Sequence, residues 1–113
     1  MKREFKHYVL DIVDSIEKIE KFTKGMRLQD FEKDDKTVFA VIRALEIIGE
    51  AVKRIPASVK NKYKQVPWKK MAGMRDKLIH EYFGVNTKVV WQTVREDIQS
   101  ISSLMKQISR ELL

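Results

Sequence analysis

The residues best suited to chemistry in this chain lie within one short stretch, MRDKLIHEYFG, which covers residues 74–84. Arg75 and His80 stand five residues apart there, and Tyr82 follows two residues after the histidine. An arginine grips a phosphate through a forked, permanently charged guanidinium. A histidine titrates near neutral pH and can take or give a proton. Beside a basic groove, this pair has the minimum parts for cleaving RNA without a metal.

Such a cleavage would use the RNA itself as the nucleophile. The 2′-hydroxyl attacks the adjacent phosphorus while histidine assists proton transfer and arginine stabilises the developing charge. DNA lacks that hydroxyl and would resist. On a regular helix Arg75 and His80 lie about 140° and 7.5 Å apart. The spacing alone is a weak signal, because a histidine near a helix end is more often a cap for backbone carbonyls than a catalyst.

Other kinds of active site find little support in the sequence. The absence of cysteine excludes disulfides and thiolate metal sites. No glycine-rich phosphate loop is present. His7 and His80 are far apart, and neither has a second ligand at metal spacing. We therefore expect no metal and no cofactor, and we interpret His7 as a surface or half-buried residue.

The positive charge of the chain is concentrated in one segment. Nine basic residues and a single acid lie between Lys53 and Lys77, a local charge of +8 in a chain whose total is +7. A polyanion is the natural partner of such a field, although a solvated lysine-rich face is an equally ordinary interpretation. Tyr63 and Trp68 lie among these lysines and suit either base stacking or a core. The RNA-binding candidates are Lys60, Lys62, Lys64, Lys69 and Lys70.

Apolar residues recur at three- and four-residue steps through three long stretches, which predicts amphipathic helices. These helices are expected from Phe5 to a stop at Gly25, from a cap at Asp34 or Asp35 to Pro56, and from a cap at Asn86 or Thr87 to Leu112. Residues 26–33 are interpreted as a connector.

Two shorter helices complete the pattern. Residues 58–64 suggest a short basic helix, and Pro67 suits the first turn of a further helix that carries the motif and ends near Gly84. The sequence therefore predicts one all-α domain over residues 1–113. Its architecture is an up-and-down bundle of four-helix type with an additional short helix.

One turn of the second helix is unusual. Gly49 costs about 1 kcal/mol relative to alanine within a helix, so we expect another backbone to approach it closely. Glu46 and Glu50 lie one turn apart and repel mildly. A basic neighbour, such as a lysine of the basic segment or Arg75, would relieve that repulsion.

The stretch RDKLIHEYF is similar to the Arg-x4-His-x-Tyr motif of HepT-type toxins in the HEPN superfamily, small all-helical ribonucleases of prokaryotes. ALEIIGEA, the pair Pro67-Trp68, MAGMRDKLIHEYF and VVWQTVREDI follow in the order of that family, so the resemblance covers most of the chain. It implies a HEPN-like helical bundle, a homodimer and metal-independent endoribonuclease activity. Arg75 and His80 match the catalytic positions. Asp76 matches the polar position after the arginine, which is often asparagine in the family.

The resemblance also implies partners. In toxin pairs of this kind the antitoxin resembles a minimal nucleotidyltransferase, which adds AMP groups to the motif tyrosine, here Tyr82. RNA is the implied substrate. Each chain brings a single candidate histidine, whereas phosphodiester cleavage uses a base and an acid. A two-fold axis beside the motif would place two His80 and two Arg75 side chains around one cleft.

Two functions of other classes remain open from the sequence. One is a catalytically silent HEPN interaction module that partners a nucleotidyltransferase, which Asp76 permits. The other is a helix-turn-helix DNA-binding protein, which needs polar base-reading side chains on its recognition helix. The segment after Pro67 offers Trp68, Met71 and Met74 instead. Nothing resembles a signal peptide or a membrane span, so a soluble cytoplasmic protein is expected.

Overall fold

Helices account for nearly all of the chain that the computed structural model describes, which is residues 4–80 and 86–112, with backbone alone for residues 76–80. The elements are α1 (Phe5–Thr23), α2 (Leu28–Lys33), α3 (Asp35–Arg54), α4 (Ala57–Lys62), α5 (Trp68–His80), α6 (Thr87–Gln92), the π-helical turn η2 (Thr93–Ile98) and α7 (Gln99–Leu112). Within those residues there is no strand. The expectation of an all-α fold is confirmed.

Local sequence signals set several helix ends. The Asp34 carboxylate accepts a hydrogen bond from the Thr37 backbone at 3.1 Å and caps the start of α3. The hydrogen bonds from Thr37 hold the pKa of Asp34 below its usual value. Gly25 has a φ of 77° just after α1, a conformation that glycine adopts without strain. Asn86 accepts a hydrogen bond from the Lys88 backbone at 2.9 Å and caps α6.

The connector expected over residues 26–33 is wrong in part, because it contains α2. The six residues of this helix are too few to show helical periodicity in the sequence. Tertiary packing stabilises it instead: Phe31 is fully buried, and the centroid of its ring lies 5.1 Å from the centroid of the Trp91 ring. Among the described residues α2 is therefore a short helix that the sequence did not indicate, in addition to the short helix predicted over residues 58–64.

The last helix also differs from the expected regular helix. Its middle turn, η2, is a π-helix between α6 and α7, and the Thr93 hydroxyl donates to the Val89 carbonyl at 2.9 Å nearby. One such turn shifts the apolar stripe slightly without ending the helix. Because the apolar stripe continues through this turn, the spacing of apolar residues in the sequence does not reveal the π-helix.

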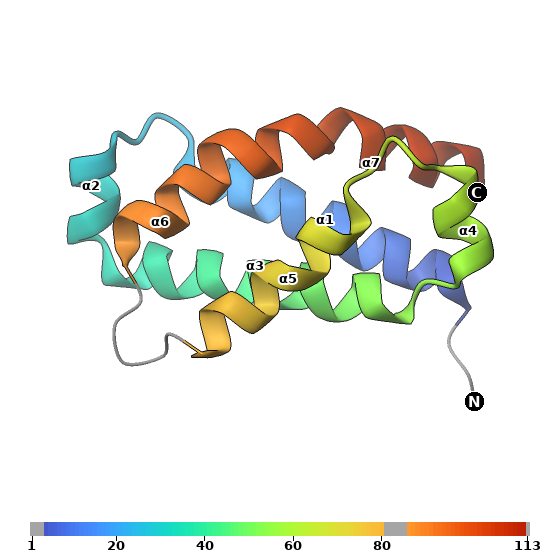
Figure 1. The fold of residues 1–113 in the computed structure, drawn as a ribbon. Coiled ribbons are helices and arrows are strands. Elements are labelled where there is room, and N and C mark those ends of the chain that lie inside the picture. Colours follow the sequence, from blue (N-terminus) through green and yellow to red (C-terminus); the bar gives the residue numbers. More distant parts are fainter. Residues whose placement is uncertain (1–3, 81–85, 113) are drawn as a thin grey trace.

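Helices α1 and α3 and the rod formed by α6, η2 and α7 run lengthwise through the bundle, and α5 crosses obliquely beside α3 (Figure 1). The short helix α2 lies at one end of the bundle and α4 at the other (Figure 1). Helix α3 packs against both α1 and α5, and α1 also packs against α7. The core includes these fully buried side chains: Ile12, Ile16, Leu45, Ile48, Met71, Ile98 and Met105. Consequently α3 is the element that positions α5.

The two aromatic residues of the basic segment belong to the core. The Tyr63 hydroxyl donates a hydrogen bond to the Glu111 carboxylate at 2.9 Å and ties the end of α4 to α7. The indole N–H of Trp68 donates to the Tyr63 carbonyl at 3.0 Å. Both rings are buried, so the base-stacking interpretation is wrong for them and the core interpretation is confirmed. None of the helices described is both long and apolar enough to cross a membrane.

Candidate active site

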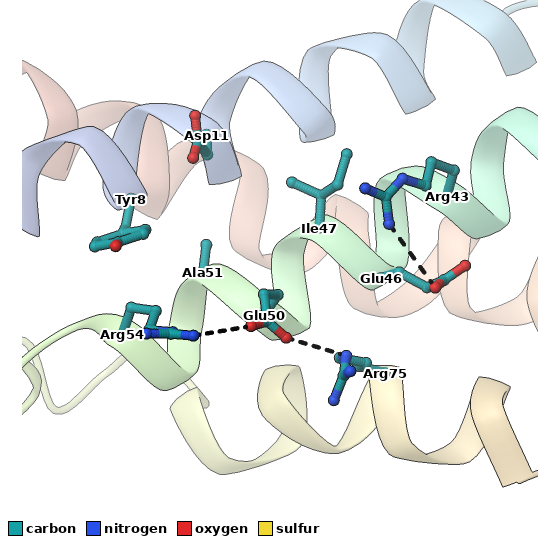
Figure 2. A pocket seen from close by; sticks show the side chains of 9 residues that line it. All are labelled: Tyr8, Asp11, Arg43, Glu46, Ile47, Glu50, Ala51, Arg54 and Arg75. Carbon is teal, nitrogen blue, oxygen red and sulfur yellow. Dashed lines mark ion pairs between the residues drawn. The ribbon is translucent and has the colours of Figure 1, made fainter. Parts of the chain in front are cut away.

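A cleft of about 500 Å³ lies where α1, α3 and α5 meet (Figure 2). Charged side chains of both signs line it together with Tyr8, Ile47 and Ala51. The charged residues are Asp11 from α1, Arg43, Glu46, Glu50 and Arg54 from α3, and Arg75 from α5. Three carboxylates thus face three guanidinium groups, and the cleft is balanced in charge rather than simply basic.

Arg75, the first motif residue, stands in this cleft and forms an ion pair with Glu50. Its Nε lies 3.1 Å from Glu50 Oε2, and the other oxygen of the same carboxylate lies 3.6 Å from a terminal nitrogen of Arg54 (Figure 2). Glu46 is 3.9 Å from Arg43. Each glutamate therefore has a basic neighbour, and the expectation that Arg75 relieves their repulsion is confirmed for Glu50.

The close approach expected at Gly49 is also present. A Cβ atom added to Gly49 would lie 2.5 Å from the Cβ of Arg75, 3.2 Å from its backbone nitrogen and 3.4 Å from the Ala72 carbonyl oxygen. Only glycine admits the α5 backbone at this distance. The contact holds Arg75 against α3 and brings its side chain alongside Glu50, which follows Gly49 in the sequence.

Helix α5 also carries the backbone of Asp76 and His80, whose side chains lie outside the described residues. A rise of about 1.5 Å per residue places the His80 backbone roughly 7.5 Å along the helix axis from Arg75. Tyr82 lies outside the described residues altogether. The structure thus locates one catalytic candidate in the cleft and the backbone of a second on the same helix.

The candidate lysines gather at a second hollow, of about 660 Å³, where α4 meets α5. Lys60, Lys64, Lys69 and Lys70 line it beside Trp68. Lys62 is not among its lining residues; its ammonium lies 5.6 Å from the ring centroid of Tyr63. Lys70 lies 2.7 Å from Asp97, and this hydrogen bond raises the pKa of the ammonium. Four of the five candidates therefore share one surface.

From the sequence, Glu46 and Glu50 were noted only for their mutual repulsion, and Asp11, Arg43 and Arg54 were not identified as residues of a site. Arg43, Glu46, Glu50 and Arg54 follow one another at three- and four-residue steps along α3, a spacing that indicates one shared face. This spacing could have identified a charged face on α3 from the sequence alone. What the sequence does not reveal is that α1 and α5 flank this face and add Tyr8, Asp11 and Arg75 to it.

Comparisons with known proteins agree with this architecture. The family described as Ribonuclease HepT-like matches residues 12–108. The chain is 53% identical to the "Probable ribonuclease HepT" of Thermococcus cleftensis, over 97% of this chain and 100% of that protein. It is 46% identical to a "Putative RNase" of Methanocaldococcus jannaschii, over 97% of this chain and 94% of that protein. A "Putative RNase" of Caldanaerobacter subterraneus is also 46% identical, over 89% of this chain and 90% of that protein.

No solved structure matches the chain. The match over most of its length shows that the chain belongs to the HepT-like ribonuclease family.

Proposed function

We propose that this chain is a metal-independent endoribonuclease that acts as the toxin of a toxin–antitoxin pair. The observation that carries the proposal is the place of Arg75: the motif arginine of a HepT-like ribonuclease stands in a cleft between three helices. His80, on the same helix, is the second catalytic residue. The substrate is cytoplasmic RNA.

The reaction follows from what these two side chains can do. The RNA 2′-oxygen forms a bond to the adjacent phosphorus while the bond from phosphorus to the 5′-oxygen breaks. His80 assists proton transfer, and Arg75 stabilises the negative charge that develops on the phosphoryl oxygens. The products are a 2′,3′-cyclic phosphate and a 5′-hydroxyl. The carboxylates in the cleft would repel a polyanion on their own, so the arginines are needed to hold the phosphate there.

The lysines of the α4–α5 hollow hold the RNA beyond the reacting phosphate. Lys60, Lys64, Lys69 and Lys70 line this surface, and α5 links it directly to Arg75. Lysine contacts to phosphate give affinity without sequence preference. Lys62 lies next to them on α4 and is the weakest candidate of the five, because it is absent from the lining of the hollow.

The partners of the chain are a second copy and an antitoxin. A homodimer with its two-fold axis beside the motif supplies two His80 side chains, one as the base and one as the acid. The antitoxin is a nucleotidyltransferase-like protein that silences the toxin by adding AMP to Tyr82. A charged, bulky group at the motif would block RNA by bulk and by repulsion.

One assay tests the proposed function. The purified protein is incubated with RNA and with DNA of matched sequence in the presence of EDTA. Cleavage of RNA alone, with 2′,3′-cyclic or 3′-phosphate ends, is the expected result. Ends with a 3′-hydroxyl, or activity that returns only with magnesium, would contradict the mechanism.

The second candidate function is a silent interaction module that partners a nucleotidyltransferase. Two observations favour it: an acidic residue, Asp76, follows Arg75, and Glu50 already pairs with that arginine. Glu50 places negative charge beside Arg75, and Asp76 adds an acid next to that arginine in the sequence. Binding of RNA without cleavage in the same assay would support this candidate over the first.

A further inference from the structure

The contact between Glu50 and Arg75 has a definite geometry. Glu50 Oε2 lies 3.1 Å from Nε of the Arg75 guanidinium (Figure 2). Arg54 lies 3.6 Å from the other oxygen of the same carboxylate. Glu50 is therefore held between two arginines of different helices, and only Arg75 belongs to the motif.

The close approach of the two backbones favours this contact. The glycine at position 49 lets the α5 backbone approach until the Arg75 Cβ lies against α3. From that starting point the arginine side chain runs past the following residue of α3, which is Glu50 (Figure 2). The ion pair is thus specified by two adjacent residues, one that admits Arg75 and one that orients it.

The pair contributes little to stability. The side chains of Glu50 and Arg75 are 48% and 34% exposed, and ion pairs exposed to this degree typically add little to stability. Orientation is a different matter, because a misplacement of about 1 Å at a catalytic group can reduce a rate about 100-fold. A contact of this kind therefore matters more for the rate of reaction than for folding.

We propose that Glu50 is a positioning residue, which holds the Nε edge of Arg75 so that the guanidinium faces the reacting phosphate. This inference rests on the proposed function of Arg75. Two other roles are chemically possible for the same carboxylate. It would act as a general base if it removed the 2′-hydroxyl proton, and as a brake if it competed with phosphate for the arginine.

Two substitutions separate these roles. Glu50→Gln keeps a polar oxygen of the same reach beside Nε but removes the charge and the capacity to take a proton. Glu50→Ala removes the acceptor as well. A matched control is Glu20→Ala: the Glu20–Lys106 pair joins α1 to α7 at 3.0 Å, and its side chains are 44% and 35% exposed. It resembles the Glu50–Arg75 pair in length and exposure but lies away from the cleft.

The experiment measures kcat and KM for RNA cleavage and the thermal midpoint of each variant. Glu50→Ala is expected to lower kcat about 10- to 100-fold, with KM and the thermal midpoint close to those of Glu20→Ala. Glu50→Gln is expected to recover most of kcat. Equal losses in the two Glu50 variants would assign proton transfer to the carboxylate, and a faster Glu50→Ala enzyme would make it a brake. Either result overturns the positioning role, as does an alanine variant with wild-type kcat.

A second measurement separates this inference from the proposed function. The Nε–Hε signal of Arg75 in the NMR spectrum, assigned by its absence from Arg75→Lys, should be protected from exchange in the wild type and in Glu50→Gln. It should lose that protection in Glu50→Ala. Cleavage that survives Arg75→Ala would refute the proposed function. If the exchange protection of the Arg75 signal were the same in Glu50→Ala as in the wild type, the positioning role would be refuted, whatever the activity.

Discussion

Arg75 and His80 are expected to act on the reaction and not on the fold. Arg75→Ala and His80→Ala should each lower RNA cleavage about 100-fold or more, because one loses charge stabilisation and the other proton transfer. Growth inhibition on expression should fall in parallel. Gel assays of RNA cleavage and the thermal midpoint measure the two effects separately. A double variant that cleaves at the wild-type rate would remove both residues from the mechanism.

Tyr82 is tested by removing its hydroxyl and keeping its ring. If the antitoxin acts by adding AMP to that oxygen, Tyr82→Phe should stay active, or nearly so, and escape enzymatic silencing by the nucleotidyltransferase with ATP. Mass spectrometry of the wild-type chain should show the adduct on Tyr82. A phenylalanine variant that is silenced normally, or an adduct on another residue, would leave Tyr82 as a packing residue.

The glycines of α3 and α5 should respond to alanine in opposite ways. At Gly49 the added Cβ would meet Arg75 at 2.5 Å, so Gly49→Ala should lower the free energy of unfolding by about 1–3 kcal/mol despite its better helix propensity. At Gly73 no atom of the described residues lies within 4 Å of that position. Gly73→Ala should therefore stabilise α5 by about 0.5–1 kcal/mol. Urea denaturation of both variants measures the difference, and equal effects would contradict it.

The elements were predictable where the sequence repeats and unpredictable where it does not. The apolar stripes of α1 and α3 and the caps at Asp34 and Asn86 follow from local rules, and they appear as expected. Helix α2 depends on the burial of Phe31 against Trp91, residues 60 positions apart, so no local pattern reveals it. The same limit applies to the cleft: Gly49 indicated a close neighbour, but only packing identifies Arg75 as that neighbour.

At the scale of the whole molecule, the lysine surface should affect the affinity for RNA and not the rate of cleavage. Changing Lys60, Lys64 and Lys69 to glutamine should reduce the slope of log affinity against log salt by about 0.7 per lost contact with single-stranded RNA. Affinity should fall most at low salt, while cleavage at saturating RNA changes little. The control makes the same change of charge at Lys21 and Lys24, at the end of α1, and at Lys33, at the end of α2. Helix α2 lies at the opposite end of the bundle from α4 (Figure 1). An equal slope in both triple variants would make the surface a solvated face.

The proposed dimer can be tested by mixing two inactive variants. If two chains build one cleft, inactive Arg75→Ala and His80→Ala proteins should restore part of the cleavage activity when they are mixed and allowed to exchange. The mixed dimer keeps one intact arginine and one intact histidine, so one of the two proton transfers still has its histidine and partial activity is expected. Random exchange makes about half of the dimers mixed. Native mass spectrometry measures the mixed fraction, so the activity can be expressed per mixed dimer. Mixed dimers that form but are no more active than the two parent proteins would contradict a cleft that works with one arginine and one histidine from different chains.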